Sequence, residues 1–168
     1  NLQQLMKLLS ARTDHSINLT DHDSAAIAKQ NLPRSRPIGS VVDKSADGAM
    51  TLLGVGKIDL PDGDTGEGIG FHTNHGDFAG ILHESPGSGQ AVVWVCGARG
   101  GFGGPGPGTY ARLSQDLTAT GITSLRLDYR FPNDVYQCAL DLLTGVAYLK
   151  GTGYGPVVVV GHSFGGAV

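Results

Sequence analysis

The last residues of the sequence place a serine in a pattern that can support nucleophilic chemistry. Residues 155–168 read GPVVVVGHSFGGAV, so Gly161, Ser163 and Gly165 form a G-x-S-x-G pattern directly after four valines. Where this pattern joins a buried strand to a helix, the turn exposes the serine hydroxyl and the glycines let strand and helix approach closely. The helix N-terminus directs free N–H groups at developing negative charge. The pattern predicts Ser163 as a nucleophile and the Phe164 N–H as an oxyanion donor.

A second oxyanion donor is expected from a glycine-rich loop that follows another strand. Residues 91–95 read AVVWV, a short apolar run that is typical of a strand buried on both faces. The loop that follows it reads CGARGG, residues 96–101. In sites built around a nucleophile of this kind, the second backbone donor comes from such a strand-end loop.

The pattern extends to a resemblance with a known family. Residues 69–168 resemble the first half of an α/β-hydrolase of the dienelactone-hydrolase, bacterial esterase or acyl-peptidase type, through VVWVCGARGG, LTATGITSLRLDYRFPND and VVVVGHSFGGAV. The resemblance implies a serine hydrolase that cleaves a small-molecule ester, thioester or amide through an acyl-enzyme at Ser163. It implies the Ala98 N–H as the second oxyanion donor, with Arg99 as the alternative. Such proteins usually carry His-Gly where this sequence has Cys96-Gly97, which removes a supporting side chain but keeps the backbone donors.

The base and acid of a serine hydrolase have no candidates after the serine. In this fold an Asp or Glu and then a His follow the nucleophile in the chain. His162 precedes Ser163, and its side chain is expected to turn away from the hydroxyl. We therefore expect the chain to be part of a longer enzyme, inactive alone and poorly soluble or oligomeric, with the valine strand at an open sheet edge. All six histidines lie before Ser163: His15, His22, His72, His75, His83 and His162.

Two alternative functions remain open. The first is a non-catalytic α/β-hydrolase-like binding module, which the unusual Cys96 and the unassigned N-terminal residues would allow. The second is a dinucleotide-binding domain, because residues 101–106 fit G-x-G-x-x-G and Asp128 ends the next strand as a possible ribose ligand. Pro105 and Pro107 weaken this second reading, since they fall where the phosphate-binding helix should run and lack N–H groups. Under the resemblance, Asp128 is instead interpreted as the acidic residue that α/β-hydrolases often carry at that strand end, in a structural role.

No cofactor and no metal is expected. His72, His75 and Asp77 are interpreted as a solvated turn. Residues 62–68, DGDTGEG, imitate a calcium-binding loop, but Gly66 and Glu67 stand where a ligand and the turn glycine should be.

The remaining pattern predicts an α/β fold. A hairpin is expected from residues 69–74 and 78–85 around a turn at 75–77, followed by strands at 91–95, 122–130 and 156–160 and helices at 109–119 and 135–150. Such alternation predicts right-handed crossovers and a mostly parallel sheet with flanking helices, the last strand also buried. This partial α/β-hydrolase fold is assigned to residues 61–168.

Residues 1–60 are taken as an N-terminal extension or the tail of a preceding segment. Helices are expected at 2–12 and 24–30, and a β-prone stretch at 50–60. The net charge of −3 and pI of about 6.0 indicate no nucleic-acid or anionic-membrane partner. Two cysteines form no disulfide framework, and no apolar run is long enough to span a membrane. The location stays open, with a cytoplasmic one favoured. The 27 glycines are clustered, which indicates special loops rather than disorder.

Overall fold

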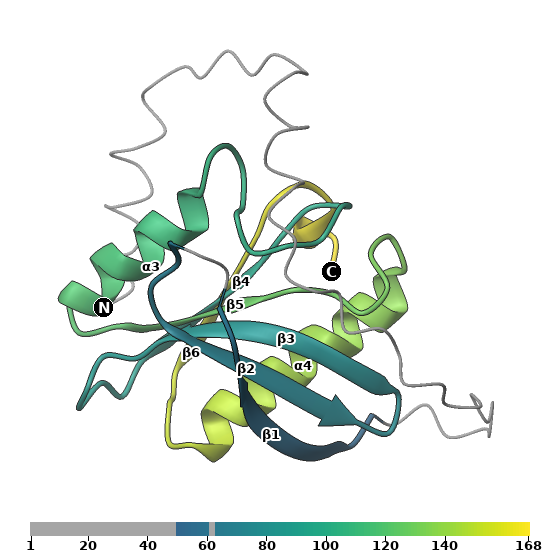
Figure 1. The fold of residues 1–168 in the computed structure, drawn as a ribbon, viewed down its shortest axis with the longest axis horizontal. Helices are drawn as coiled ribbons and strands as arrows, with labels where there is room; N and C mark the ends of the chain where they lie inside the picture. The colour runs from purple at the N-terminus through teal and green to yellow at the C-terminus, as the bar shows by residue number, and fades with distance from the viewer. Residues whose placement is uncertain (1–49, 61–62) are drawn as a thin grey trace.

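A single mixed sheet organises the part of the chain that the computed structural model describes, residues 50–60 and 63–168 (Figure 1). Its six strands are ordered β1-β2-β3-β5-β4-β6. The strands are β1 (Leu52–Ile58), β2 (Glu67–Thr73), β3 (Gly76–His83), β4 (Ala91–Val95), β5 (Thr123–Leu127) and β6 (Val157–Gly161). The helices are α3 (Thr109–Ala119), α4 (Val135–Gly151) and a 3₁₀ helix, Ser163–Gly166. The helices expected at 2–12 and 24–30 lie outside the described residues.

The expectation of a mostly parallel sheet is wrong. Strand β1 pairs with β2, β2 with β3 and β3 with β5 in antiparallel fashion, and only the β4–β5 and β4–β6 pairs are parallel. The physical reason is the length of the connections. Parallel neighbours need a long crossover, which α3 and α4 supply, whereas the two-residue turn that joins β2 to β3 permits antiparallel pairing alone. The β-prone stretch at 50–60 contributes β1 to this antiparallel half.

The predicted hairpin is confirmed as β2–β3, with its turn slightly earlier than expected. The turn residues are Asn74 and His75, and Gly76 already belongs to β3 with a φ of 107°, which glycine adopts without strain. Phe71 and Phe78 face each other across the pair with ring centroids 4.7 Å apart. Such cross-strand aromatic pairs stabilise a hairpin and fix its register.

The two helices cover opposite faces of the sheet because β4 alternates between two cores. Ala91, Val93 and Val95 pack with residues of α4, whereas Val92 and Trp94 pack with residues of α3. Side chains alternate between the faces of a strand, so an all-apolar strand must be covered on both sides. Figure 1 shows α3 and α4 on either side of the sheet. The prediction of a doubly buried strand at 91–95 is confirmed.

The last strand is less buried than its sequence suggests. The run Val157–Gly161 pairs with β4 alone among the described strands, and Val159 is 45% exposed. The expected open edge is therefore present in the described sheet, but the expected burial of β6 is wrong. A valine run specifies a strand, whereas burial depends on how many neighbours that strand has.

A buried ion pair joins β5, α4 and the hairpin. The side chains of Arg130 and Asp141 are 3% and 0% exposed. Asp141 accepts hydrogen bonds from the Arg130 side chain and from its backbone N–H, the latter at 2.9 Å. The Arg130 guanidinium also donates to the His75 carbonyl at 2.7 Å. One arginine therefore fixes the β2–β3 turn and helix α4 to the end of β5.

Removing one partner of this pair is expected to destabilise the protein strongly. Asp141→Ala leaves the Arg130 charge buried without its carboxylate, which costs about 3–5 kcal/mol. Asp134 is a matched control on the same helix, since its side chain caps α4 by accepting from the Gln137 N–H at 3.0 Å. Loss of such a cap in Asp134→Ala costs about 1 kcal/mol. Urea unfolding measures both values, and an Asp141→Ala loss no larger than that of Asp134→Ala would contradict the prediction.

Candidate active site

Three parallel strands bring three loops to one edge of the sheet. Val95 is in register with Leu127 of β5 and with Gly161 of β6, so these strands end side by side. The segments that begin at Cys96, Asp128 and His162 must therefore start next to one another. In open α/β sheets the carboxyl ends of the strands are the usual location of ligand sites.

Ser163 has the strained backbone that the sequence pattern predicts. Its φ is +54°, in the left-handed region, while His162 before it is extended. The Gly165 N–H donates to the His162 carbonyl at 2.9 Å and closes the turn into the 3₁₀ helix. Among the described residues the other non-glycine with a positive φ is Asn133, a type that adopts this conformation readily. Strain of this kind at a serine is typical of functional sites.

Glycine is required on both sides of Ser163. A Cβ at Gly161 would lie 2.0 Å from the Gly165 carbonyl oxygen, which is far inside van der Waals contact. A Cβ at Gly165 would lie 2.4 Å from the carbonyl oxygen of Cys96 and 2.7 Å from that of Val95. The Ser163 turn thus rests directly on the last residues of β4.

The glycine-rich loop, Cys96–Gly101, lies beside the serine. A Cβ at Gly97 would be 3.5 Å from the Ser163 Cβ. The Gly100 N–H donates to the Gly97 carbonyl at 3.0 Å, so Ala98 and Arg99 are the two central residues of a β-turn. Ala98 is half-buried and Arg99 is exposed. The structure brings this turn and Ser163 together; the donor roles of Ala98, Arg99 and Phe164 stay predictions.

Two residues after β5 contact this loop, and the sequence analysis did not identify one of them. Asp128 Oδ1 accepts from the Gly101 N–H at 2.5 Å, and the Tyr129 hydroxyl donates to the Cys96 carbonyl at 3.2 Å. Asp128 was noticed because it ends a strand at the sheet edge. The sequence gives little indication of the role of Tyr129, because its hydroxyl bonds to a carbonyl 33 positions away in the chain.

Cys96 has the features of a structural thiol. It is buried, and its Sγ accepts from the Gly104 N–H at 3.3 Å. Burial raises the pKa of the Cys96 thiol to about 11, so the sulfur is protonated at neutral pH and is a poor nucleophile. Cys96 therefore supports the chain just beyond the Cys96–Gly101 loop, at Gly104.

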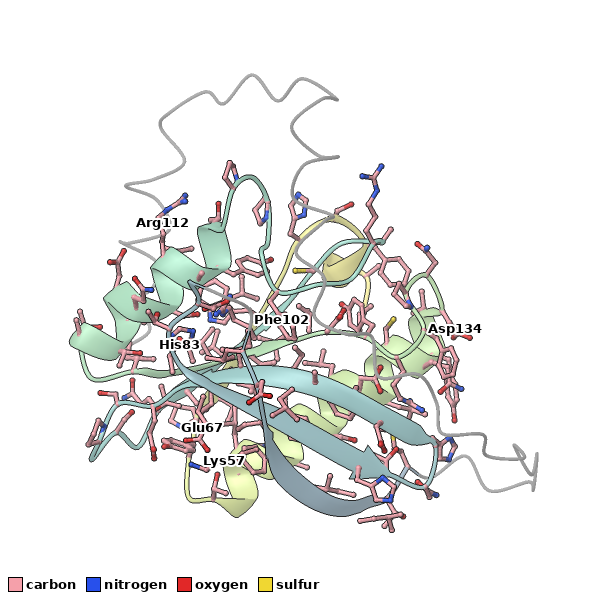
Figure 2. The ribbon with its side chains drawn as sticks, in the orientation of Figure 1. Lys57, Glu67, His83, Phe102, Arg112 and Asp134 are labelled. Atoms are coloured by element: carbon pink, nitrogen blue, oxygen red, sulfur yellow. The ribbon has the colours of Figure 1, made fainter. Side chains whose placement is uncertain are left out.

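The histidines of the described residues lie in three places. His162 is exposed and adjacent to Ser163, with its Nδ1 3.7 Å from the position of a Cβ at Gly97. His72 bonds to Asp77 on the exposed hairpin, through Nδ1 and Oδ1 at 2.5 Å. His83 is buried near α3 and well apart from the 3₁₀ helix (Figure 2).

His83 belongs to a buried polar group that lies along β5. It is in register with Ser124, near the start of β5. The Arg126 guanidinium contacts His83 Nε2 at 3.0 Å and forms an ion pair with Asp64, a residue of the segment considered for calcium. A shallow hollow of about 440 Å³ opens beside His83, between β3 and α3. This hollow is at the opposite edge from Ser163, so it is not part of the candidate site.

The described residues contain no obvious metal site. Within residues 50–60 and 63–168, no group of three or more histidine, cysteine, aspartate or glutamate side chains is placed to bind a metal ion. Over the same ranges, none of the helices combines the length and apolar character needed to cross a membrane.

Comparisons with known proteins give a partial similarity to a solved structure. No protein-family model matches the chain, and no curated protein matches it. A solved structure described as a "putative dipeptidyl aminopeptidase IV" from Bacteroides ovatus is similar at 21% sequence identity with a TM-score of 0.43. The similarity covers 70% of this chain and 18% of that one. The chain therefore spans less than a fifth of the length of that structure.

Gly165 and Gly166, neighbours in the turn after Ser163, should differ sharply in how much stability the protein loses when each is replaced by alanine. Gly165→Ala would force a methyl group into the Cys96 carbonyl and is expected to cost about 3 kcal/mol of stability. Gly166→Ala is the matched control, because a Cβ there meets its nearest atom, the Gly161 oxygen, at 3.8 Å. Urea unfolding of both variants measures the difference. Equal stability of the two variants would contradict the close approach of the turn to β4.

Acid should destabilise the protein through His83. Burial, and next the positive charge of Arg126, lower the pKa of His83 to about 4. The unfolded chain binds this proton below about pH 6.5 and the folded protein does not until about pH 4, so stability falls as the pH is lowered across this window. His83→Gln keeps an acceptor for Arg126 but cannot titrate. The free energy of unfolding of this variant should fall by about 2 kcal/mol less than that of the wild type when the pH is lowered from 7 to 5. Urea unfolding at the two pH values checks this. Equal losses of stability in the variant and in the wild type would show that the pKa of His83 is not lowered in the folded protein.

Proposed function

We propose that this chain carries the nucleophile and the oxyanion donors of a serine hydrolase. One observation carries the proposal: Ser163 has a left-handed backbone at a strand-to-helix turn that lies against the glycine-rich loop after β4. A strained φ at a non-glycine residue is costly and clusters at functional sites, which supports a catalytic role for this serine. The arrangement fits the geometry in which a serine hydroxyl is presented to a carbonyl above the sheet edge.

The reaction is acyl transfer from a small-molecule ester, thioester or amide. Ser163 Oγ attacks the carbonyl carbon and gives its proton to a base, and the carbonyl oxygen becomes an oxyanion. The N–H groups of Phe164 and Ala98, with Arg99 as the alternative, donate to this oxyanion. Collapse of the intermediate expels the protonated alcohol, thiol or amine and leaves an acyl-Ser163 ester, which water then hydrolyses.

In the Ser-His-Asp arrangement of serine hydrolases, the base is a histidine that a carboxylate orients. The His72–Asp77 pair has the right chemistry but the wrong position. Its strand, β2, is four strand positions from β6, which corresponds to roughly 19 Å at the usual spacing between strands. The proposal therefore assigns the base to a residue other than His72.

A fluorophosphonate probe tests the proposal on the protein that contains this chain. The probe phosphonylates an activated serine, so the wild type should be labelled and Ser163→Ala should lose labelling by about 1,000-fold or more. Ser88→Ala is the control, because Ser88 lies in the loop between β3 and β4 and should not affect labelling. Labelling that survives Ser163→Ala would refute the nucleophile. A protein that is folded but never labelled would favour a non-catalytic binding module.

A further inference from the structure

We propose that Asp128 and Tyr129 are positioning residues that hold the Cys96–Gly101 loop against the Ser163 turn. The inference rests on the proposed function, because its catalytic consequence requires oxyanion donors in that loop. Neither residue is assigned a contact with substrate. Both act through the backbone of the loop and through Phe164.

Asp128 fixes the far end of the loop. Its Oδ1 accepts from the Gly101 N–H at 2.5 Å and from the Tyr129 N–H at 2.8 Å. Gly100 and Gly101 both have positive φ values, 68° and 85°. A Cβ at Gly100 would lie 2.6 Å from the same carboxylate oxygen. The two glycines thus allow the backbone to approach the carboxylate closely. A side chain at position 100 would collide with the Asp128 carboxylate.

Tyr129 fixes the near end of the loop and also contacts the serine turn. Its hydroxyl donates to the Cys96 carbonyl at 3.2 Å in a buried position. Its ring packs edge-on against Phe164, with centroids 6.2 Å apart and planes at 85°. The Cys96 carbonyl that it binds is the one against which Gly165 packs. A single side chain therefore contacts both segments that supply the proposed oxyanion donors.

The central residues of the loop lie between these two anchors. Ala98 and Arg99 are bounded by the Cys96 carbonyl on one side and by the Gly101 N–H on the other. Oxyanion donors act only when they lie about 2.7–3.1 Å from the developing charge, so small shifts of the loop reduce transition-state stabilisation. Loss of an anchor should lower kcat and leave KM almost unchanged, because the donors act mainly on the transition state.

The test compares two substitutions at Asp128 in the protein that contains this chain. Asp128→Asn keeps an oxygen acceptor for the Gly101 N–H, whereas Asp128→Ala removes it. With p-nitrophenyl acetate as substrate, Asp128→Ala should lower kcat by about 100-fold with KM within about twofold, and Asp128→Asn should recover most of that loss. Asp77→Ala, on the exposed hairpin, is the control and should leave kcat unchanged.

A second readout follows the loop without activity. Hydrogen–deuterium exchange of the peptide that spans the loop should be faster in Asp128→Ala than in the wild type or in Asp128→Asn. Tyr129→Phe, which removes only the hydroxyl, should also speed exchange and should lower kcat by about tenfold. Where Asp128→Ala fails to fold, Asp128→Asn and Tyr129→Phe carry the comparison.

The outcomes separate this inference from the proposed function. Unchanged exchange and unchanged kcat in Asp128→Ala and Tyr129→Phe would overturn the positioning role. A kcat loss in Asp128→Asn as large as that in Asp128→Ala would do the same, because the retained acceptor should rescue. If Ser163→Ala does not abolish labelling, the proposed function fails and the catalytic consequence fails with it. Exchange then still decides whether Asp128 and Tyr129 hold the loop.

Discussion

The close contact between Gly165 and the end of β4 is the constraint on which the candidate site depends. A Cβ at Gly165 would lie 2.4 Å from the Cys96 carbonyl oxygen and 2.7 Å from that of Val95. The turn after β6 can therefore approach the end of β4 this closely only because residue 165 is glycine. This approach places Ser163 beside Gly97, in a turn where the serine has a left-handed backbone. A larger residue at position 165 would separate the nucleophile from the loop that is proposed to stabilise its oxyanion.

The strand end that receives Gly165 is fixed from both faces of the sheet. Tyr110, a residue of α3 that packs in the core on that side of the sheet, donates its hydroxyl hydrogen to the Val95 carbonyl at 3.2 Å. Tyr129, in the core under α4, donates to the Cys96 carbonyl at the same distance. Buried carbonyls without partners would cost free energy, and both of these have partners, since the Val95 carbonyl also accepts from the His162 N–H at 3.3 Å. Each core thus contacts one of two consecutive residues at the end of β4, where the loop starts.

Periodicity in the sequence predicted the local elements well and their environment less well. Helices expected at 109–119 and 135–150 are present as Thr109–Ala119 and Val135–Gly151, because the spacing of leucines and valines determines which face of a helix is buried. The proportion of parallel pairs was overestimated, since β1 could not be placed before its pairing with β2 was known. The burial of β6 was overestimated because four valines specify a strand but not its neighbours.

In the candidate site too, the local turn could be predicted from the sequence, whereas the tertiary contacts could not. The turn at Ser163 follows from the local pattern of glycines, and its positive φ agrees with that expectation. The role of Tyr129 depends on the parallel register of β4 and β5, which no local pattern contains. The Arg130–Asp141 pair was also not anticipated, because two charged residues separated by 11 positions give no sign of complete burial.

Strand β5 links the antiparallel half of the sheet to the candidate site. One residue before its carboxyl end, Arg126 forms an ion pair with Asp64, from the segment before β2. Beyond its carboxyl end Arg130 binds the His75 carbonyl of the hairpin turn and Asp141 of α4. Asp128 and Tyr129 lie between these two arginines, so their backbone is held from both directions. Side chains that orient a loop can do so only if their own backbone does not move. Burying the charges of Arg126 and Arg130 costs desolvation free energy, but their ion pairs hold the backbone from which Asp128 and Tyr129 contact the Cys96–Gly101 loop.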